Sequence, residues 1–530
     1  MNQSSRRIQP VAAALVRWVG WRDPFGCVRW VPPCALAALA AFPPLGWHAL
    51  GWLALAPLAL GLRAGAGGVA AWAAAGWGWG LLFFAVRFAW LQHAFVVQAG
   101  MGWLHFVNVF ALLVAVLALV PAAVLAGARA AWLRWGLSPL AVLPLLLAGQ
   151  DALLGAVPFG GVAWGSLAAP QAHTWAARLI VPVLGGAGLV LLLGLVSAGW
   201  GAWALPLLRG AGLRALPRRQ WIAGAGWAAL TLACGWPAPL PPAPAEARPV
   251  AVLLVPGDLS IAQLNAQRDT PLPLRDYLAR TLTGIADLPL GGAARLVLWP
   301  ESAVPGVIAR GKTLAELSAL GGLLGVDLLL GSNALERGRE YNSAYLVNGG
   351  AFEFWRYDKQ RLVPFGEYVP AGFRWLFPSK LTAGEADYAA GTGPPVLTWR
   401  SERLGLAICF ESILPGHARA AVQGGATLLV AIANDAWLTP AARREHVQLT
   451  ALRGLEVGRD VLLVANRGWS AHLRGGRAVA LAAPGTGPLA VHPALRAQRT
   501  PFARWGHAPL ALLAALLLGA AAWRRVRAAE

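Results

Sequence analysis

The sequence predicts an α-helical membrane bundle joined to one α/β domain, and two observations lead to this fold class. First, 57% of the 530 residues are hydrophobic and 13% are charged, which is too apolar for an ordinary soluble protein. Second, the apolar pattern changes near residue 250. Before that point, apolar stretches are long enough to cross a bilayer. After it, they are short runs separated by helical or turn segments.

The bundle is predicted to have about eight spans, because a membrane helix needs roughly 17–25 mainly apolar residues. About seven spans lie within residues 1–236, and one more lies near the C-terminus. The first is short and is interrupted by Pro43 and Pro44. The predicted spans are 32–45, 46–62, 66–91, 105–127, 138–157, 178–207, 220–236 and 507–523.

Arginines predict the orientation of these spans. They occur in the N-terminal tail, in alternate loops and in the basic tail 524–530, whereas the loops around 45, 92–104 and 158–177 contain neither Lys nor Arg. Because positive charge favours the cytoplasmic side, both termini are predicted to be cytoplasmic. The domain between the last two spans is then extracytoplasmic.

The net charge of +20 does not indicate a nucleic-acid partner. Residues 248–504 hold 27 Lys and Arg against 20 Asp and Glu, a surplus of 7, so the remaining +13 lies in the loops and tails of the apolar segments. This distribution is typical of membrane topology signals rather than of a DNA-binding face.

No cofactor or metal is expected. Of the four cysteines, Cys409 has no partner within its own domain, and neither a disulfide framework nor a CxxC metal site is available. The nine histidines lack a ligand spacing such as HExxH, and no phosphate-binding or dinucleotide fingerprint lies between a strand and a helix.

Few polar groups occur within the predicted spans, notably Arg87, Gln150 and Asp151. Charge inside a membrane is energetically costly, so these residues could form a lipid-headgroup or helix-pairing site. Hydrogen bonding between helices, or snorkelling to the interface, is the simpler explanation and the one we favour.

A proline-rich linker, 237–249, leads into the predicted α/β domain, 250–505. Strands are expected at seven short apolar runs, which alternate with helical segments such as 274–285 and 417–423. The runs are 250–255, 296–299, 328–330, 343–347, 404–409, 428–432 and 461–464.

Three residues with catalytic potential follow these runs. Glu301 comes just after one run, behind Pro300, and Cys409 ends another. Lys359 is one of three lysines in a chain with 41 arginines, which is consistent with a need for a compact ammonium group. A carboxylate base, a cation and a thiol together suit nucleophilic catalysis. Taken singly, each has a simpler explanation, since a lone cysteine is usually a small buried hydrophobe and loop charges are usually solvated.

The motifs around these residues resemble the Glu-Lys-Cys triad of the nitrilase superfamily. They are WPES at Glu301, YDKQRLVPFGEYVP at Lys359 and ICFES at Cys409. With spans on both sides, and with NDAW at 434–437 followed by His446 and ALRGLEVGR at 451–459, the chain is similar to the apolipoprotein N-acyltransferase family.

This resemblance implies an αββα sandwich with Glu301 as general base, Lys359 as oxyanion-stabilising group and Cys409 as nucleophile. Glu367 and Glu411 would shape the site and orient Lys359, although a purely structural role for either is nearly as plausible. The further supporting or substrate-binding residues would be Tyr357, Phe410, Asn434 and Trp437.

The implied reaction transfers an acyl chain from a phospholipid, typically phosphatidylethanolamine, through a cysteine thioester. The acceptor would be the α-amine of S-diacylglyceryl-cysteine on an apolipoprotein. The implied protein is a monomer in the bacterial inner membrane with a periplasmic catalytic domain. Apolar loops such as 373–381 and the segment after Trp437 would cover the site, unless they serve ordinary packing.

Three departures from the family pattern concern substrate preference rather than the triad. Phe410 stands where many relatives carry tyrosine, Pro256-Gly257-Asp258 replaces a Gln-Gly-Asn loop, and the turn at 466–470 lacks the usual Thr-Gly.

Two alternative functions follow from the sequence. The first is a membrane-tethered amidase or carbamoylase, for which eight spans are more than an anchor needs. The second is a transporter or channel, for which no internal repeat is visible.

Overall fold

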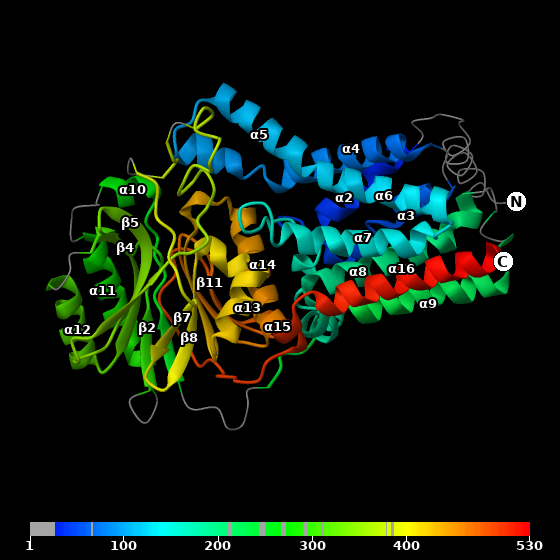
Figure 1. Ribbon diagram of the computed structural model, residues 1–530. Coiled ribbons are helices and arrows are strands. Elements are labelled where there is room, and N and C mark those ends of the chain that lie inside the picture. Colours follow the sequence, from blue (N-terminus) through cyan, green and yellow to red (C-terminus); the bar gives the residue numbers. More distant parts are fainter. Residues whose placement is uncertain are drawn as a thin grey trace, which may run out of the picture.

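The computed structural model describes residues 27–64, 67–208, 212, 215–242, 250–266, 272–289, 294–308, 312–377, 379–382 and 386–529. Residues 1–26 of the predicted N-terminal tail and residues 243–249 of the predicted linker therefore lie outside the described residues. Figure 1 shows two parts, a bundle of roughly parallel helices and an α/β domain at one end of it.

The bundle holds nine α-helices among the described residues, with short helical turns η1 (Val28–Trp30), η2 (His48–Trp52), η3 (His93–Gln98) and η4 (Ala169–Gln171). The last helix, α16, runs away from the α/β domain (Figure 1). The nine are α2 (Val31–Ala40), α3 (Ala56–Ala64), α4 (Val69–Arg87), α5 (Trp103–Leu117), α6 (Leu119–Trp135), α7 (Pro139–Leu154), α8 (Trp175–Leu208), α9 (Arg218–Gly235) and α16 (Ala508–Ala529).

Three helical stretches of the described chain are long and apolar enough to cross a membrane: Val69–Arg87, Trp103–Trp135 and Trp175–Leu207. The prediction of eight spans is therefore not confirmed. The stretches predicted as the first two spans contain α2 and α3, of 10 and 9 residues. At 1.5 Å per residue each reaches only about half of the hydrocarbon core.

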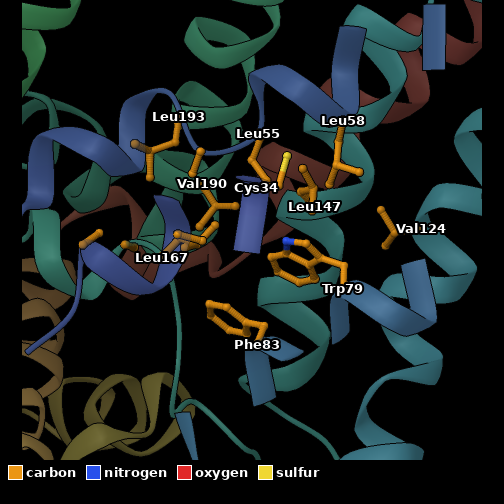
Figure 2. Packing of buried hydrophobic residues seen from close by; sticks show 14 of the residues in the cluster. Cys34, Leu55, Leu58, Trp79, Phe83, Val124, Leu147, Leu167, Val190 and Leu193 are labelled. Carbon is orange, nitrogen blue, oxygen red and sulfur yellow. The ribbon is translucent and has the colours of Figure 1, made fainter. Parts of the chain in front are cut away.

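The bundle core is a continuous set of buried aliphatic and aromatic side chains. Figure 2 shows Cys34 among leucines and valines, close to Trp79 and Phe83. The rings of Trp79 and Phe83 stack with centroids 4.8 Å apart. Helix α4 approaches α6 closely because it carries glycine, since a Cβ atom at Gly76 would lie 2.4 Å from the carbonyl oxygen of Pro121. Small residues are the usual means of bringing membrane helices together.

The α/β domain contains two sheets with mixed parallel and antiparallel strands. The first has the order β13-β1-β2-β4-β5-β6, with β3 also pairing with β4, and the second has the order β12-β11-β10-β9-β8-β7. The strands are β1 (Val250–Leu254), β2 (Ala294–Leu298), β3 (Val304–Val307), β4 (Asp327–Glu336), β5 (Arg339–Val347), β6 (Phe354–Asp358), β7 (Val396–Trp399), β8 (Glu402–Ile408), β9 (Leu428–Asn434), β10 (Val461–Asn466), β11 (Ser470–Arg474), β12 (Arg477–Ala482) and β13 (Leu489–Val491).

The two sheets pack face to face between two helical layers, so the expected αββα sandwich is confirmed (Figure 1). Strands β1, β9 and β10 are buried along their whole length. This explains their uninterrupted apolar sequences, because inner parallel strands are covered on both faces. The helices are α10 (Ile261–Ala266), α11 (Leu272–Gly284), α12 (Lys312–Leu324), α13 (Pro415–Gln423), α14 (Pro440–Val457) and α15 (Pro501–Trp505), with turns η6 (Ile285–Asp287), η7 (Cys409–Ile413) and η8 (Asp435–Trp437).

Helix α14 joins the domain to the bundle. Its Leu449, Leu452 and Leu455 belong to the same buried cluster as the core of the bundle, and so do Ile413 and Leu414 beside η7. The two parts therefore share one apolar core, and the segment that follows β8 is held at their junction.

Candidate active site

The three predicted catalytic residues lie together, each just beyond the end of a strand. Glu301 follows β2, Lys359 follows β6 and Cys409 follows β8. All three line one cavity of about 380 Å³. Strand ends of a two-sheet sandwich can place loop residues at one edge while the buried strands keep them rigid.

Cys409 occupies a strained corner of the backbone. Its φ of 53° is in the left-handed region, which non-glycine residues rarely adopt. Such strain is found at functional sites that the surrounding structure holds in place. Burial raises the pKa of the Cys409 thiol, and Glu301 raises it further, while Lys359 acts in the opposite direction. The resting form is therefore the thiol, which needs a base close by.

Glu301 is the carboxylate placed to act as that base. It is 7% exposed, its Oε2 accepts a hydrogen bond from the backbone N–H of Asn434 at 2.7 Å, and its Oε1 accepts one from Asn342 Nδ2 at 2.7 Å. Burial raises the pKa of Glu301, an effect that Lys359 partly offsets. A raised pKa increases the affinity of this carboxylate for a proton released by a thiol or an amine.

Lys359 is a buried ammonium between two carboxylates. Its Nζ donates to Glu367 Oε1 at 3.0 Å and lies 3.7 Å from Glu301 Oε1. Burial alone would lower the pKa of Lys359, but Glu367 and then Glu301 outweigh it, so the pKa is raised. The lysine is therefore cationic, and Glu367 lies where it can orient it. Glu367 is itself fixed by the backbone N–H of Val363 at 2.8 Å.

Asn342, in β5, was not anticipated from the sequence. Its Nδ2 donates to Glu301 Oε1 and also to Glu367 Oε1, at 2.7 and 2.9 Å, so one amide fixes both carboxylates. Its backbone oxygen accepts a hydrogen bond from the N–H of Lys359 at 2.8 Å. The sequence signal for Asn342 was weak, because it consisted of a polar residue just before the predicted strand 343–347.

Glu411 lies outside the cavity lining and joins two loops of the site. It is fully buried and accepts hydrogen bonds from the backbone N–H groups of Gln360, Arg361 and Ile408 at 2.7, 3.0 and 2.9 Å, and from the Tyr357 hydroxyl at 2.9 and 3.0 Å. Its contacts connect the loop after Lys359 to the strand before Cys409. Tyr357 likewise lies behind the site rather than in the cavity.

Phe410, Asn434 and Trp437 line the cavity, as the resemblance implies. Asn434 also supplies the backbone N–H that binds Glu301. Much of the remaining wall belongs to the membrane bundle and is apolar. It includes Phe88, Trp90, Leu91, Ala94, Phe95, Val109 and Leu113, from the segment between α4 and α5 and from α5 itself.

The loop expected to cover the site packs against this bundle wall. Phe377 is 2% exposed and lies in one cluster with Phe95, Val109 and Phe373. The rings of Phe377 and Phe365 have centroids 4.6 Å apart. The cavity is thus bounded by the α/β domain on one side and by membrane helices on the other. In the described part of the chain, no three His, Cys, Asp or Glu residues are grouped as metal ligands.

A partly buried thiol lies with a buried carboxylate and a buried ammonium at the strand ends of an αββα sandwich that faces a helical membrane bundle. Together they define a membrane-associated protein with a carbon–nitrogen hydrolase domain. Comparison with protein families agrees. Residues 34–199 match the apolipoprotein N-acyltransferase N-terminal domain and residues 260–485 match the carbon-nitrogen hydrolase family.

The chain is 30% identical to an apolipoprotein N-acyltransferase from Geobacter metallireducens, covering 82% of this chain and 84% of the relative. It is 31% identical to one from Gloeobacter violaceus, covering 81% of each. The chain belongs to the apolipoprotein N-acyltransferase family, and it is an acyltransferase of lipoprotein biosynthesis.

Solved structures of the nitrilase superfamily resemble it more distantly. A CN-hydrolase superfamily protein from Xanthomonas campestris is 17% identical with a TM-score of 0.36, covering 46% of this chain and 90% of that one. A mutant amidase from Nesterenkonia is 18% identical with a TM-score of 0.36, covering 51% of this chain and 97% of that one.

Proposed function

We propose that Cys409 carries the acyl group as a thioester during transfer from a membrane phospholipid, phosphatidylethanolamine, to the N-terminal α-amine of S-diacylglyceryl-cysteine on an apolipoprotein. One observation carries this proposal. Cys409, Glu301 and Lys359 line a single cavity whose opposite wall consists of apolar side chains from the membrane bundle. Such a cavity suits a reacting ester at the end of an acyl chain.

In the first half-reaction, Glu301 takes the proton from the Cys409 thiol, and the sulfur forms a bond to the ester carbonyl carbon. The Lys359 ammonium stabilises the resulting oxyanion. The bond to the glycerol oxygen then breaks, and this oxygen takes the proton from Glu301. The products are a lysophospholipid and the acyl thioester.

In the second half-reaction, the acceptor amine attacks the thioester carbonyl, with Lys359 again stabilising the oxyanion. Glu301 takes a proton from the amine, the carbon–sulfur bond breaks, and the Cys409 sulfur recovers a proton from Glu301. The product is an amide, and the enzyme returns to its starting state. The apolar wall excludes water that would otherwise hydrolyse the thioester between the two steps.

We also propose the arrangement in the membrane that the arginine pattern predicts. The chain would cross a bacterial inner membrane about eight times, act as a monomer, and keep both termini cytoplasmic and residues 250–505 periplasmic. Reporter fusions active in only one compartment, placed at the C-terminus and in the turn between β4 and β5 after Glu336, test this orientation. The same reporter active at both positions would contradict it.

Intact-protein mass spectrometry tests the thioester directly. The purified enzyme is incubated with phosphatidylethanolamine alone, and we expect an added acyl mass that hydroxylamine removes. The adduct should be absent from Cys409→Ala and present in Cys234→Ala, which removes a cysteine outside the cavity. An unmodified enzyme with intact lipid would favour the amidase alternative, and amide substrates would then be screened.

A further inference from the structure

A chain of buried polar side chains lies next to Cys409, and its central member, His446, also lines the cavity. Ser412 Oγ donates a hydrogen bond to the backbone oxygen of Cys409 at 2.7 Å and lies 2.8 Å from His446 Nε2. His446 Nδ1 lies 2.9 Å from Asp435 Oδ1. The chain joins three elements, since Ser412 is in η7, His446 in α14 and Asp435 in η8. None of its side chains is more than 6% exposed.

Counting hydrogens determines the protonation of the His446 ring. A serine hydroxyl has one hydrogen, which cannot serve both the Cys409 carbonyl and an unprotonated His446 Nε2. Both contacts are satisfied only when Nε2–H donates to Ser412. The Asp435 carboxylate accepts but cannot donate, so Nδ1 must carry a hydrogen as well. A ring with hydrogens on both nitrogens is an imidazolium.

The charges around His446 support this form. Burial alone would lower its pKa, but Asp435 outweighs this and Glu301 adds to the effect, so the pKa of His446 is raised. The adjacent Glu445 pairs with Arg87 of α4 and therefore presents no free negative charge. Lys359 also acts on the Cys409 thiol as a cation, and it is itself paired with Glu367 at 3.0 Å.

We propose that His446 is a positioning residue for acyl transfer. Held as an imidazolium by Asp435, it fixes Ser412, and Ser412 holds the Cys409 carbonyl so that the backbone keeps its left-handed corner. The positive charge of His446 also offsets that of Asp435, whose carboxylate raises the pKa of the Cys409 thiol. Without it, the thiolate would be less favoured. This inference rests on the proposed role of Cys409 as nucleophile.

Alkylation of Cys409 by N-ethylmaleimide, followed by peptide mapping, tests this role without any lipid. His446→Gln keeps an N–H donor toward Ser412 but loses the charge. At pH 6.5 it should alkylate about tenfold more slowly than the wild type, as expected for a shift of about one pKa unit. The ratio should approach one as the pH rises through the pKa of His446, because the wild-type ring then loses its charge too.

Ser412→Ala should also slow alkylation, at high pH as well as at pH 6.5, because it removes the hydrogen bond to the Cys409 carbonyl whatever the charge of His446. The matched control is His472→Gln, which removes another buried histidine, 2.7 Å from Asp460 and outside the cavity lining. It should alkylate like the wild type.

A His446→Gln rate ratio that stays constant with pH, a Ser412→Ala variant that alkylates like the wild type, or an equal loss in His472→Gln would each overturn the inference. If Ser412→Ala fails to fold, the pH dependence of His446→Gln decides alone. Because alkylation needs no phospholipid, its result stands apart from that of the acyl-adduct experiment.

Discussion

Asn342 makes the strongest prediction about a single residue. Its amide donates to Glu301 and Glu367 together, so it holds the proposed base, Glu301, and the partner of Lys359, Glu367, in one geometry. Asn342→Ala should lower the rate of acyl-adduct formation by about 10- to 100-fold, equivalent to about 1.4–3 kcal/mol. Asn342→Asp should be worse, because it places a third carboxylate against the first two. Mass spectrometry measures the rate of acyl-adduct formation in each variant. An Asn342→Ala variant with the wild-type rate would show that the amide is dispensable.

The protonation of Glu301 makes a second prediction at this scale. As the proposed base, Glu301 must be ionised to take a proton, and burial raises its pKa above the ordinary value for glutamate of about 4.3. Acidification should therefore slow adduct formation at a higher pH than an exposed glutamate would produce. Glu301→Gln should be much slower and should lose this acidic limb, as pH–rate profiles of the two proteins would reveal. If the acidic limb persists in Glu301→Gln, another group is the base.

At the scale of elements, Glu411 links the end of β6 to the end of β8. Both of its oxygens face N–H donors, so in Glu411→Gln the new NH₂ group must face at least one of them. An unsatisfied buried donor costs about 1–3 kcal/mol. We expect Glu411→Gln to have a lower midpoint of thermal unfolding in detergent than the wild type and to form the acyl adduct more slowly. Glu353→Gln, at an exposed glutamate of the same domain, should change neither. Equal midpoints for the two variants would contradict this role.

The elements that carry Glu301 and Cys409 could be predicted because each residue ends an uninterrupted apolar run, which marks a buried strand. Strand β6, which precedes Lys359, was not predicted, because its sequence FWRYD is interrupted by charged residues. Asn342 could not, since it is a buried polar residue of the inner strand β5, and no local pattern in the sequence shows that it is buried beside two carboxylates. The link between His446 and Cys409 depends on how α14 packs over η7, which no local pattern encodes.

The bundle was predicted least well. Trp103–Trp135 is one apolar stretch of 33 residues broken into α5 and α6 near Ala118, whereas a single span at 105–127 was expected.

At the scale of the whole molecule, one buried ion pair joins the bundle to the catalytic domain. Arg87, at the end of α4, pairs with Glu445 of α14, and its guanidinium lies 4.1 Å from the ring centroid of Phe42. Glu445 also accepts a hydrogen bond from the backbone N–H of Gly165 at 3.1 Å. This explains the charge noted within the predicted span, because the arginine reaches a carboxylate of the other domain instead of lipid.

Removing one partner of this pair should destabilise the whole protein. Arg87→Ala leaves Glu445 buried and unpaired, which typically costs about 3–5 kcal/mol. Arg87→Ala with Glu445→Gln should recover most of this loss, because the uncompensated charge is gone and the amide oxygen can still accept from Gly165. Thermal unfolding in detergent, followed both by a signal from the bundle tryptophans and by adduct formation at Cys409, should show the two parts failing together in Arg87→Ala. A double variant as unstable as Arg87→Ala would mean that the arginine stabilises the junction by packing on Phe42 rather than by its charge.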